Sequence, residues 1–552
     1  MKFEKILAKS ELEKRNIEEY GKAPAYEGSG VEEVAFSLDA YRSYYVYEHD
    51  ANESDYYAYC QKLVESGFEC FSSKQANGNL FATYTDGENI VNVSYISYKD
   101  VDRYVVREMS YVLISVDSVR NSNLPCKAEK FEAVTSVTVS VINMLTIIVK
   151  LLDGRFLVID GSVYSNTDHI YDELCKQNVL EGKPVVAAWM FSHAHGDHVG
   201  GFIGILEKYG DKVEVQSVIH NFPGEHQYGN NKNYMEGMPN REGEYMTNRS
   251  NTIHRLMNEQ GKGDRFVIAH AGQIFEYPGV KLEVLMTAEN IYKTRMFDTN
   301  MSSVVYMLTM PGGKMLALGD AVDAESKLLR RVYGKDIKCD AVVLAHHAYN
   351  GGDEEMYYDT GAKAAIWSST YEGAFERKLP GDFTNHFDYY GVKYNFMMSN
   401  NDAAMTLYQG MSEEEVARFD RKADVRRYAP VDYEARKNPK ICLTQKHLDE
   451  GFGNAPRYYG TGEDTQVLTV NEAEKSYTVT VEGVSEYDFD YYRNSLKRDG
   501  YWPKEKTETE DAIHTVYTSP DHTVLIDFFK NSAKIVVTVG REGKDVLVYQ
   551  NV

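Results

Sequence analysis

The sequence predicts a mixed α/β (α+β) protein in which a central domain of packed sheets and helices is flanked by two small α+β modules. Two observations carry this prediction. Strand-like runs alternate with helical patterns through the middle of the chain, and a segment near the start is matched without a gap by a segment near the end. A chain of 552 residues is too long for one hydrophobic core, so two to four domains are expected.

The middle of the chain is rich in strand pairs and in helices that follow strands. An Asp-Gly turn and a Pro-Gly-Gly turn each separate two apolar runs of strand length, which is typical of hairpins. The predicted hairpin strands are 147–152 with 155–159, and 304–310 with 314–318. The predicted helices are 199–209 and 324–332. Strands that alternate with helices predict packed layers of sheet and helix.

The two flanking modules are predicted from an internal repeat. Residues 53–95 match residues 486–528 at a constant offset of 433. In each copy a Tyr and a Leu four residues apart fit one face of a helix, and a Gly fits the helix end. Neither copy holds a ligand cluster, so we expect a packing, substrate-edge or dimerisation role, with a homo-oligomer formed through these modules. The predicted domains are a helical arm (1–34), a first module (35–117), a central domain (125–425), a linker (427–470) and a second module (471–552).

Composition limits the classes of partner. The net charge of −23 argues against binding nucleic acid through a general basic field. The sequence contains no run of about 20 apolar residues, so no membrane span is expected. The first residues lack the apolar core of a secretory signal. The six cysteines are scattered without a Cys-x-x-Cys pair, which indicates free thiols and a cytoplasmic location.

The most informative motif is a cluster of metal-ligand side chains after an apolar run. Residues 185–191 have the length and composition of a buried strand. His193, His195, Asp197 and His198 follow within a few positions. Imidazole nitrogens and carboxylate oxygens are ligands of zinc and similar divalent ions. A loop at the end of a strand can turn alternate side chains toward two neighbouring metals.

The pattern His-x-His-x-Asp-His resembles the signature of the metallo-β-lactamase superfamily, and the resemblance covers about residues 130–420. It implies a four-layer αββα sandwich and two divalent metal ions, zinc or alternatively manganese or iron. In that superfamily an apolar strand ending in Gly-Asp supplies a carboxylate that bridges the metals, and Asp320 occupies this position. The implied ligands of one metal are His193 and His195 with a third residue. Those of the other metal are Asp197, His198 and His347.

A second segment resembles one branch of the superfamily. The strand at 342–344 and the pair His346-His347 are similar to a segment of the hydrolase domain of competence DNA-uptake proteins and of teichoic-acid phosphorylcholine esterase. That branch continues with Gly-Ser, whereas Ala348-Tyr349 follows here. By the resemblance His347 is the metal ligand and His346 faces the substrate as proton donor or phosphoryl contact; the reverse assignment stays open.

Further site residues are expected at other strand ends. Asp298 lies before a stretch similar to the Asn-x-x-Ser of the branch and is the candidate for the missing metal ligand, with His220 and His270 as alternatives. Asp160 occupies the position of a family carboxylate that orients a ligand histidine. The substrate pocket is expected around Tyr349, Asn350 and Asn221.

These residues together imply a metal-dependent hydrolase. The resemblance implies that a hydroxide bridging the two ions attacks an ester bond, with catalytic roles for Asp197 and His346. The branch resemblance implies a phosphodiester substrate, and a small one is favoured because an acidic protein suits long polyanions poorly. A lactone or thioester hydrolase is the alternative, and a non-catalytic scaffold stabilised by its metals is the alternative from another class. Iron redox chemistry is less favoured, because the tail shows no phosphate-binding Gly-rich loop.

Overall fold

The computed structural model divides the chain into two compact units. The first comprises residues 1–97, 110–377 and 390–422, and the second residues 98–109, 378–389 and 423–552. The described residues are 23–30, 32–38, 43–101, 103–104, 107–118, 138–142, 145–223, 241–291, 299–348, 351–368, 394–397, 405–407, 441–498, 501–519 and 522–541.

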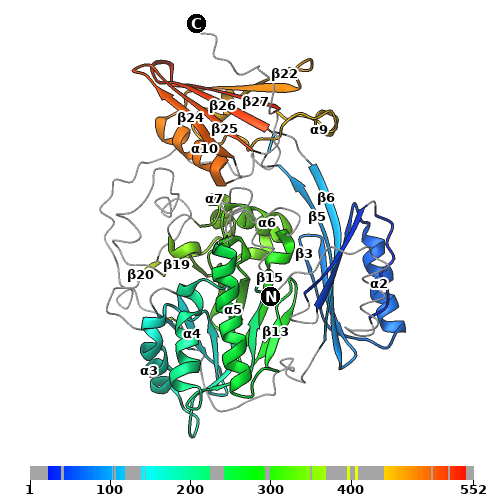
Figure 1. Cartoon of the computed structure of the whole chain (residues 1–552), viewed down its shortest axis with the longest axis vertical. Helices are drawn as coiled ribbons and strands as arrows, with labels where there is room; N and C mark the ends of the chain where they lie inside the picture. Colours follow the sequence, from blue (N-terminus) through cyan, green and yellow to red (C-terminus); the bar gives the residue numbers. More distant parts are fainter. Residues whose placement is uncertain are drawn as a thin grey trace. The chain divides into compact units, whose positions relative to one another are not determined.

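The first unit begins with a sheet of six strands in the order β1-β2-β6-β5-β4-β3. Helix α2 (Glu53–Glu65) lies along one face of this sheet (Figure 1). Its buried Tyr56, Tyr59 and Leu63 join the strand residues Val91 and Val112 in one apolar core. The strands are β1 (Glu32–Leu38), β2 (Ser43–His49), β3 (Glu69–Ala76), β4 (Asn79–Thr85), β5 (Asn89–Asp100) and β6 (Arg107–Ser118).

The central domain of the first unit holds two larger sheets. The first runs in the order β13-β12-β10-β9-β8-β7-β21, with β11 paired to β10, and the second in the order β14-β15-β16-β17-β18-β19-β20. The strands of the first are β7 (Thr138–Ile142), β8 (Thr146–Lys150), β9 (Phe156–Ile159), β10 (Val185–Met190), β11 (Glu214–Val215), β12 (Val218–His220), β13 (Phe266–Ile268) and β21 (Met405–Leu407). Those of the second are β14 (Ile274–Tyr277), β15 (Val280–Met286), β16 (Val305–Met310), β17 (Gly313–Ala317), β18 (Ala341–Val343), β19 (Ala364–Trp367) and β20 (Tyr394–Met397).

The two sheets pack face to face and helices cover them. One continuous core joins strand residues of both sheets, such as Val149 and Met190 with Tyr306 and Val343. Against the first sheet, Phe202 of a covering helix contacts Trp189 of β10. The helices of this domain are α3 (Thr167–Gln177), α4 (Gly196–Tyr209), α5 (Arg241–Glu259), α6 (Asp323–Tyr333) and α7 (Glu354–Thr360). The predicted layered α/β fold, with its hairpins and its helices after strands, is confirmed.

The parallel strands of both sheets end where the predicted ligands begin. In the first sheet β9, β10, β12 and β13 run parallel, and in the second β17, β18 and β19 do so. Open α/β sheets bind ligands outside the carboxyl ends of such strands. The segments that follow β10, β17 and β18 carry the histidines and aspartates of the predicted metal site.

A buried charge cluster joins the six-stranded module to the central domain. His270 follows β13, and its Nε2 lies 2.5 Å from the Asp117 carboxylate on β6, while its Nδ1 lies 2.8 Å from Glu289. Tyr47 of the module donates its hydroxyl to the Glu289 carbonyl oxygen. Both ring nitrogens of His270 therefore face carboxylates of the junction, and its alternative role as a metal ligand stays a prediction.

The second unit is built on a sheet of the same strand order as the first module. Its order is β22-β23-β27-β26-β25-β24, and helix α10 follows the second strand as α2 does in the first module. Helices α2 and α10, strands β4 and β25, and the starts of β5 and β26 are each separated by the offset of 433. The elements are α9 (Gln445–Asp449), β22 (Val467–Asn471), β23 (Ser476–Glu482), α10 (Glu486–Arg498), β24 (Trp502–Glu508), β25 (Ala512–Thr518), β26 (His522–Phe529) and β27 (Lys534–Arg541).

The predicted linker at 427–470 needs a correction in its described part. Leu443, Phe452 and Tyr458 are buried in the core of the second unit, and β22 begins at Val467. Charged residues such as Lys446 and Glu450 lie between the first two of these apolar anchors, and the charge of the segment misled the prediction. The predicted helical arm at 1–34 lies outside the described residues up to residue 22.

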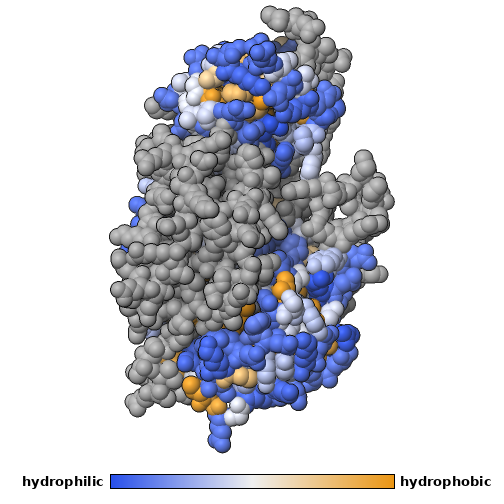
Figure 2. Space-filling model, turned by 90° about the vertical axis from the view of Figure 1, so that its left-hand side faces the viewer, coloured by the Kyte–Doolittle hydropathy of each residue, from blue (hydrophilic) through white to orange (hydrophobic). Residues whose placement is uncertain are grey.

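The face drawn in Figure 2 is mostly hydrophilic where its residues are described. Figure 2 shows one face on which the coloured atoms are largely polar, with small apolar patches between them. Exposed large apolar side chains are scattered along the sequence, from Tyr57 to Phe529. Among the described helices, none combines the length and apolar character that crossing a bilayer requires.

The junction cluster predicts a pH-dependent contribution to stability. Although burial opposes the charged form, Asp117 and Glu289 raise the pKa of His270 to about 10. This contribution is complete below the unfolded-state pKa of about 6.5 and is lost as pH rises through the folded value. We expect His270→Gln to lower the free energy of unfolding by about 3 kcal/mol at pH 6.5, and the difference from wild type to shrink toward pH 10. Denaturant unfolding at both pH values measures it.

A matched control is His514→Gln, because His514 also pairs with a carboxylate, Asp527, but in a half-exposed position. A small effect is expected there. A His270→Gln difference that stays constant from pH 6.5 to pH 10 would contradict the cation between two carboxylates.

Candidate metal centre

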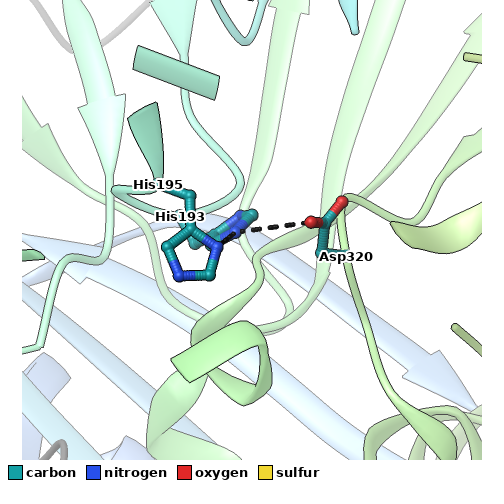
Figure 3. Close-up of side chains that lie close together, drawn as sticks. All are labelled: His193, His195 and Asp320. Atoms are coloured by element: carbon teal, nitrogen blue, oxygen red, sulfur yellow. Dashed lines mark hydrogen bonds and ion pairs between the residues drawn. The ribbon is translucent and has the colours of Figure 1, made fainter. Parts of the chain in front are cut away.

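Six predicted ligands converge into two groups of three. His193, His195 and Asp320 form one group, and Asp197, His198 and His347 form the other. Within each group the potential ligand atoms lie within 4.8 Å of one another. The first group is drawn in Figure 3, where the His193 ring points toward the Asp320 carboxylate and the His195 ring lies beside it.

In the first group, one ring nitrogen of each histidine faces the other ligands; we call it the inner nitrogen and the other one the outer nitrogen. His193 Nε2 lies 2.8 Å from His195 Nδ1 and 3.7 Å from Asp320 Oδ2. The outer nitrogens are held elsewhere: His193 Nδ1 lies 3.0 Å from Ser192 Oγ, and His195 Nε2 lies 2.9 Å from Thr299 Oγ1. A hydrogen bond at the outer nitrogen sets the ring orientation and the tautomer.

The second group follows the same arrangement. His347 Nε2 lies 3.2 Å from Asp197 Oδ2, and its Nδ1 lies 3.2 Å from the Ser368 carbonyl oxygen. His198 Nδ1 lies 2.9 Å from Asp160 Oδ2, so its Nε2 faces inward. Each imidazole of both groups is thus held by one nitrogen and offers the other to the centre.

Asp320 links the two groups. Its Oδ2 faces His193 of the first group, whereas its Oδ1 lies 3.1 Å from His198 Nε2 and 3.8 Å from His347 Nε2. Asp320 follows β17 in the sequence and is buried, and its backbone N–H donates to Ser303 Oγ. One oxygen toward each group is the geometry of a carboxylate that can bridge two cations.

Asp160 is the anchor behind His198. The backbone N–H of Ser192 donates to its Oδ1 at 2.7 Å, and the Ser192 hydroxyl donates to its Oδ2 at 2.8 Å. Trp189 Nε1 donates to the Asp160 carbonyl oxygen. Gly201 on α4 lets this loop approach, because a methyl group there would lie 2.1 Å from the Gly161 carbonyl oxygen.

The loops that carry the ligands contain left-handed backbone. His346, His347 and Ala348 have φ values of 50°, 51° and 62°, and Asp160 has 56°. Such conformations in residues other than glycine cost about 1–3 kcal/mol each and cluster at functional sites. The strain here is concentrated in the loops that follow β9 and β18.

The ligand carboxylates and imidazoles shift one another's pKa values. Burial opposes ionisation of Asp320, but the imidazoles of His198 and His347 hold its pKa well below the usual value. Burial opposes the charged form of His198 too, but Asp320 and Asp160 raise its pKa well above the usual value. By contrast, burial, with His198 and His195 nearby, lowers the pKa of His193.

The donor set fits a pair of divalent cations. His198 Nε2 and Asp320 Oδ1 are buried and have no hydrogen-bond partner among the described residues, although they face one another. Buried polar atoms are normally satisfied, so this pair indicates a site for a cation. Four imidazoles and two carboxylates are ligands suited to zinc, manganese or iron.

Other predicted site residues lie at different positions around the centre. The half-buried His346 belongs to neither ligand group, and its Nε2 lies 3.4 Å from Asn300 Nδ2. Asn221 donates both amide hydrogens, to the Ala269 carbonyl oxygen and to Glu289, so its substrate contact stays a prediction. His220, an alternative ligand, accepts from the Phe222 backbone N–H at Nδ1 and belongs to neither group.

Three predicted residues lie outside the described part of the chain. These are Asp298, Tyr349 and Asn350. Their roles as ligand and as substrate contacts stay predictions. Asp320 occupies the third place in the first group.

The supporting contacts of Ser192, Thr299 and Ser368 were missed by sequence reasoning. Ser192 directly precedes His193, and Thr299 directly follows Asp298, so their closeness to predicted site residues was a usable signal. Ser368 acts through its backbone carbonyl, and a backbone contact carries no signal in residue type.

Comparisons with known proteins found distant structural likenesses. No protein-family model matches the chain, and no curated protein matches it. Among solved structures, CmlA, a diiron β-hydroxylase from Streptomyces venezuelae, matches with 10% identity and a TM-score of 0.30 over 51% of this chain and 55% of that one. A metallo-β-lactamase with a HARLDQ motif from Cronobacter sakazakii matches with 14% identity and a TM-score of 0.22 over 38% and 71%.

A third match is zinc-bound PqqB from Methylobacterium extorquens, with 14% identity and a TM-score of 0.24 over 36% of this chain and 59% of that one. The chain therefore spans little more than half the length of two of these three proteins. The candidate metal centre rests on the geometry of its own side chains.

The two ligand groups predict two bound cations per chain. Metal-free protein titrated with Zn²⁺ should bind two ions, and Asp320→Asn should weaken both sites, because one oxygen faces each group. Isothermal titration calorimetry and metal analysis measure this. The control is Asp168→Asn, which makes the same change at an exposed carboxylate on α3. One ion per wild-type chain would contradict the dinuclear arrangement.

The anchor behind His198 predicts a separate effect on metal affinity. Asp160→Asn keeps an acceptor for the Ser192 N–H, and asparagine tolerates the left-handed backbone. It loses the charge that orients His198, so we expect about 10–100-fold weaker metal binding with an unchanged fold. Competition with a chelator and circular dichroism measure the two quantities, and wild-type affinity in this variant would refute the orienting role.

Proposed function

We propose that the chain is a metal-dependent hydrolase of the metallo-β-lactamase superfamily with a dinuclear centre. The observation that carries this proposal is the Asp320 carboxylate, which turns one oxygen toward each group of ligand side chains. A structural metal site is normally closed by four protein ligands. Here each group offers three side chains, which leaves room for water or substrate.

The chain's own residues hold and orient this centre. Divalent cations supply a nucleophile from water at neutral pH and polarise an ester oxygen. Asp160 and Ser192 fix the ring of His198, and Thr299 fixes that of His195. Asp197 comes from the first turn of α4 and closes the second group opposite His347.

The charge balance supports an anionic substrate. Imidazoles must be neutral to bind a cation, so with metal bound the two carboxylates and four imidazoles would bring a charge of about −2. Two divalent cations would then leave this ligand set positive by about two units. Such a centre stabilises an anionic ester and the further charge that develops on it. A small phosphodiester is the substrate class we propose, because the net charge of −23 disfavours a long polyanion.

His346 is the residue proposed to face the substrate. It lies beside the ligand His347 but belongs to neither ligand group, and it is half-buried. The Asn300 amide lies near its Nε2 and orients the ring. From this place an imidazole can contact the substrate or give a proton to the leaving group.

The proposal predicts turnover of bis-p-nitrophenyl phosphate by the zinc- or manganese-loaded full chain. Asp197→Asn should lower kcat/KM by about 100-fold or more, because the second group loses a charged ligand. Release of p-nitrophenol measures it. The Asp168→Asn variant should keep wild-type turnover and metal content.

A parallel assay with a lactone and a thioester separates the substrate classes. Turnover of these neutral esters alone would replace the phosphodiester assignment. No turnover of any of the three at full metal occupancy would refute the hydrolase and favour a metal-stabilised binding scaffold.

A further inference from the structure

Two side chains of α5 lie against the loop that carries the first metal ligands. Tyr245 and Arg249 are one helical turn apart, and α4 and α5 run side by side (Figure 1). A methyl group at Gly196 would lie 2.7 Å from Tyr245 Oη and 3.0 Å from both Nε and Nη2 of Arg249. The Tyr245 and His195 rings are 6.4 Å apart. The guanidinium therefore lies beside the residue between His195 and Asp197.

Stacking holds the Arg249 guanidinium in place. Its central carbon lies 3.5 Å from the centre of the Tyr245 ring, which is a close cation–π contact. In such stacking the ring contacts the face of the guanidinium and leaves its edge, with the N–H donors, free to bind a partner. Arg249 is half-buried.

Among the described residues of the first unit, Arg249 differs from several other arginines because no carboxylate there pairs with it. Within the described residues, the interaction recorded for its guanidinium is the stacking on Tyr245. Other described arginines pair with carboxylates, namely Arg155 with Asp153, Arg255 with Glu259, Arg265 with Glu214 and Arg330 with Glu355. In a chain with 83 acidic and 60 basic residues, an arginine without a carboxylate beside a metal centre indicates a site for an external anion.

We propose that Arg249, stacked on Tyr245, binds an anionic group of the substrate at the edge of the metal centre. The inference rests on the proposed hydrolase function and names a substrate-binding residue for it. A planar guanidinium forms paired hydrogen bonds with a carboxylate or with two phosphate oxygens. The absence of a side chain at Gly196 is what allows the guanidinium to reach this place.

The test compares esters that differ in charge. The metal-loaded full chain is assayed with bis-p-nitrophenyl phosphate, with mono-4-nitrophenyl succinate, which carries a free carboxylate, and with neutral p-nitrophenyl acetate. We expect Arg249→Gln to lower kcat/KM for the charged esters by about 10–100-fold, the loss typical of a charged hydrogen bond. For the acetate the change should stay within about threefold, because no anion contact is lost.

Two further variants separate anion binding from structural support. Arg249→Lys keeps the charge without the planar fork and should restore part of the loss. Arg255→Gln is the matched control, since Arg255 lies on the same helix in an exposed pair with Glu259; its kcat/KM should equal wild type. An equal loss on the charged and neutral esters, or no loss, would overturn the proposal.

The ester whose kcat/KM falls in Arg249→Gln identifies the anionic group that Arg249 binds. A loss on the phosphodiester alone assigns Arg249 to the reacting phosphate, whereas a loss on the succinate ester as well assigns it to any planar anion near the centre. Both outcomes support the inference.

A binding measurement keeps the inference separate from the hydrolase proposal. Inorganic phosphate is titrated calorimetrically into metal-loaded wild type and Arg249→Gln, with metal content measured in both. If no ester is turned over but phosphate binds about tenfold more weakly to the variant, the hydrolase proposal fails and the anion site stands. Equal phosphate affinity overturns the anion site whether or not esters are hydrolysed.

Discussion

The buried Asp320 carboxylate is the constraint on which the site depends. A carboxylate removed from water is costly unless positive or hydrogen-bonding groups surround it. Its partners come from distant parts of the chain, His193 and His198 after β10 and His347 after β18. The two sheets must therefore pack with the carboxyl ends of these strands at one place. The shared apolar core supplies the stabilisation that this arrangement requires.

The rigidity of the ligand rings has a second source in their outer nitrogens. Ser192, Thr299, Asp160 and the Ser368 carbonyl each hold one ring. The left-handed backbone of His346, His347 and Ala348 lies in the loop that carries the ligand of the second sheet. Held in this way, the rings need little rearrangement to accept a cation, so less of its binding energy is spent on ordering the protein.

The sequence predicted those features whose residues lie close together along the chain. The cluster from His193 to His198 lies in one loop, and the repeat lies in two ungapped segments, so both could be found by inspection. The role of Arg249 could not be found this way, because its closeness to Gly196 arises only when α5 packs beside α4. The 427–470 segment was misjudged for a related reason: its buried Phe452 and Tyr458 find their core only in the folded second unit.

The assignment of residues 98–109 to the second unit constrains how the chain can be divided. Tyr104, at the tip of the β5–β6 hairpin, is fully buried in that unit's core, and its carbonyl oxygen accepts from the Leu443 N–H. A protein that ended before residue 440 would expose this aromatic ring to water. The hairpin would then present an apolar side chain to other molecules. Related proteins that lack the second unit are therefore expected to have a shorter β5–β6 hairpin as well.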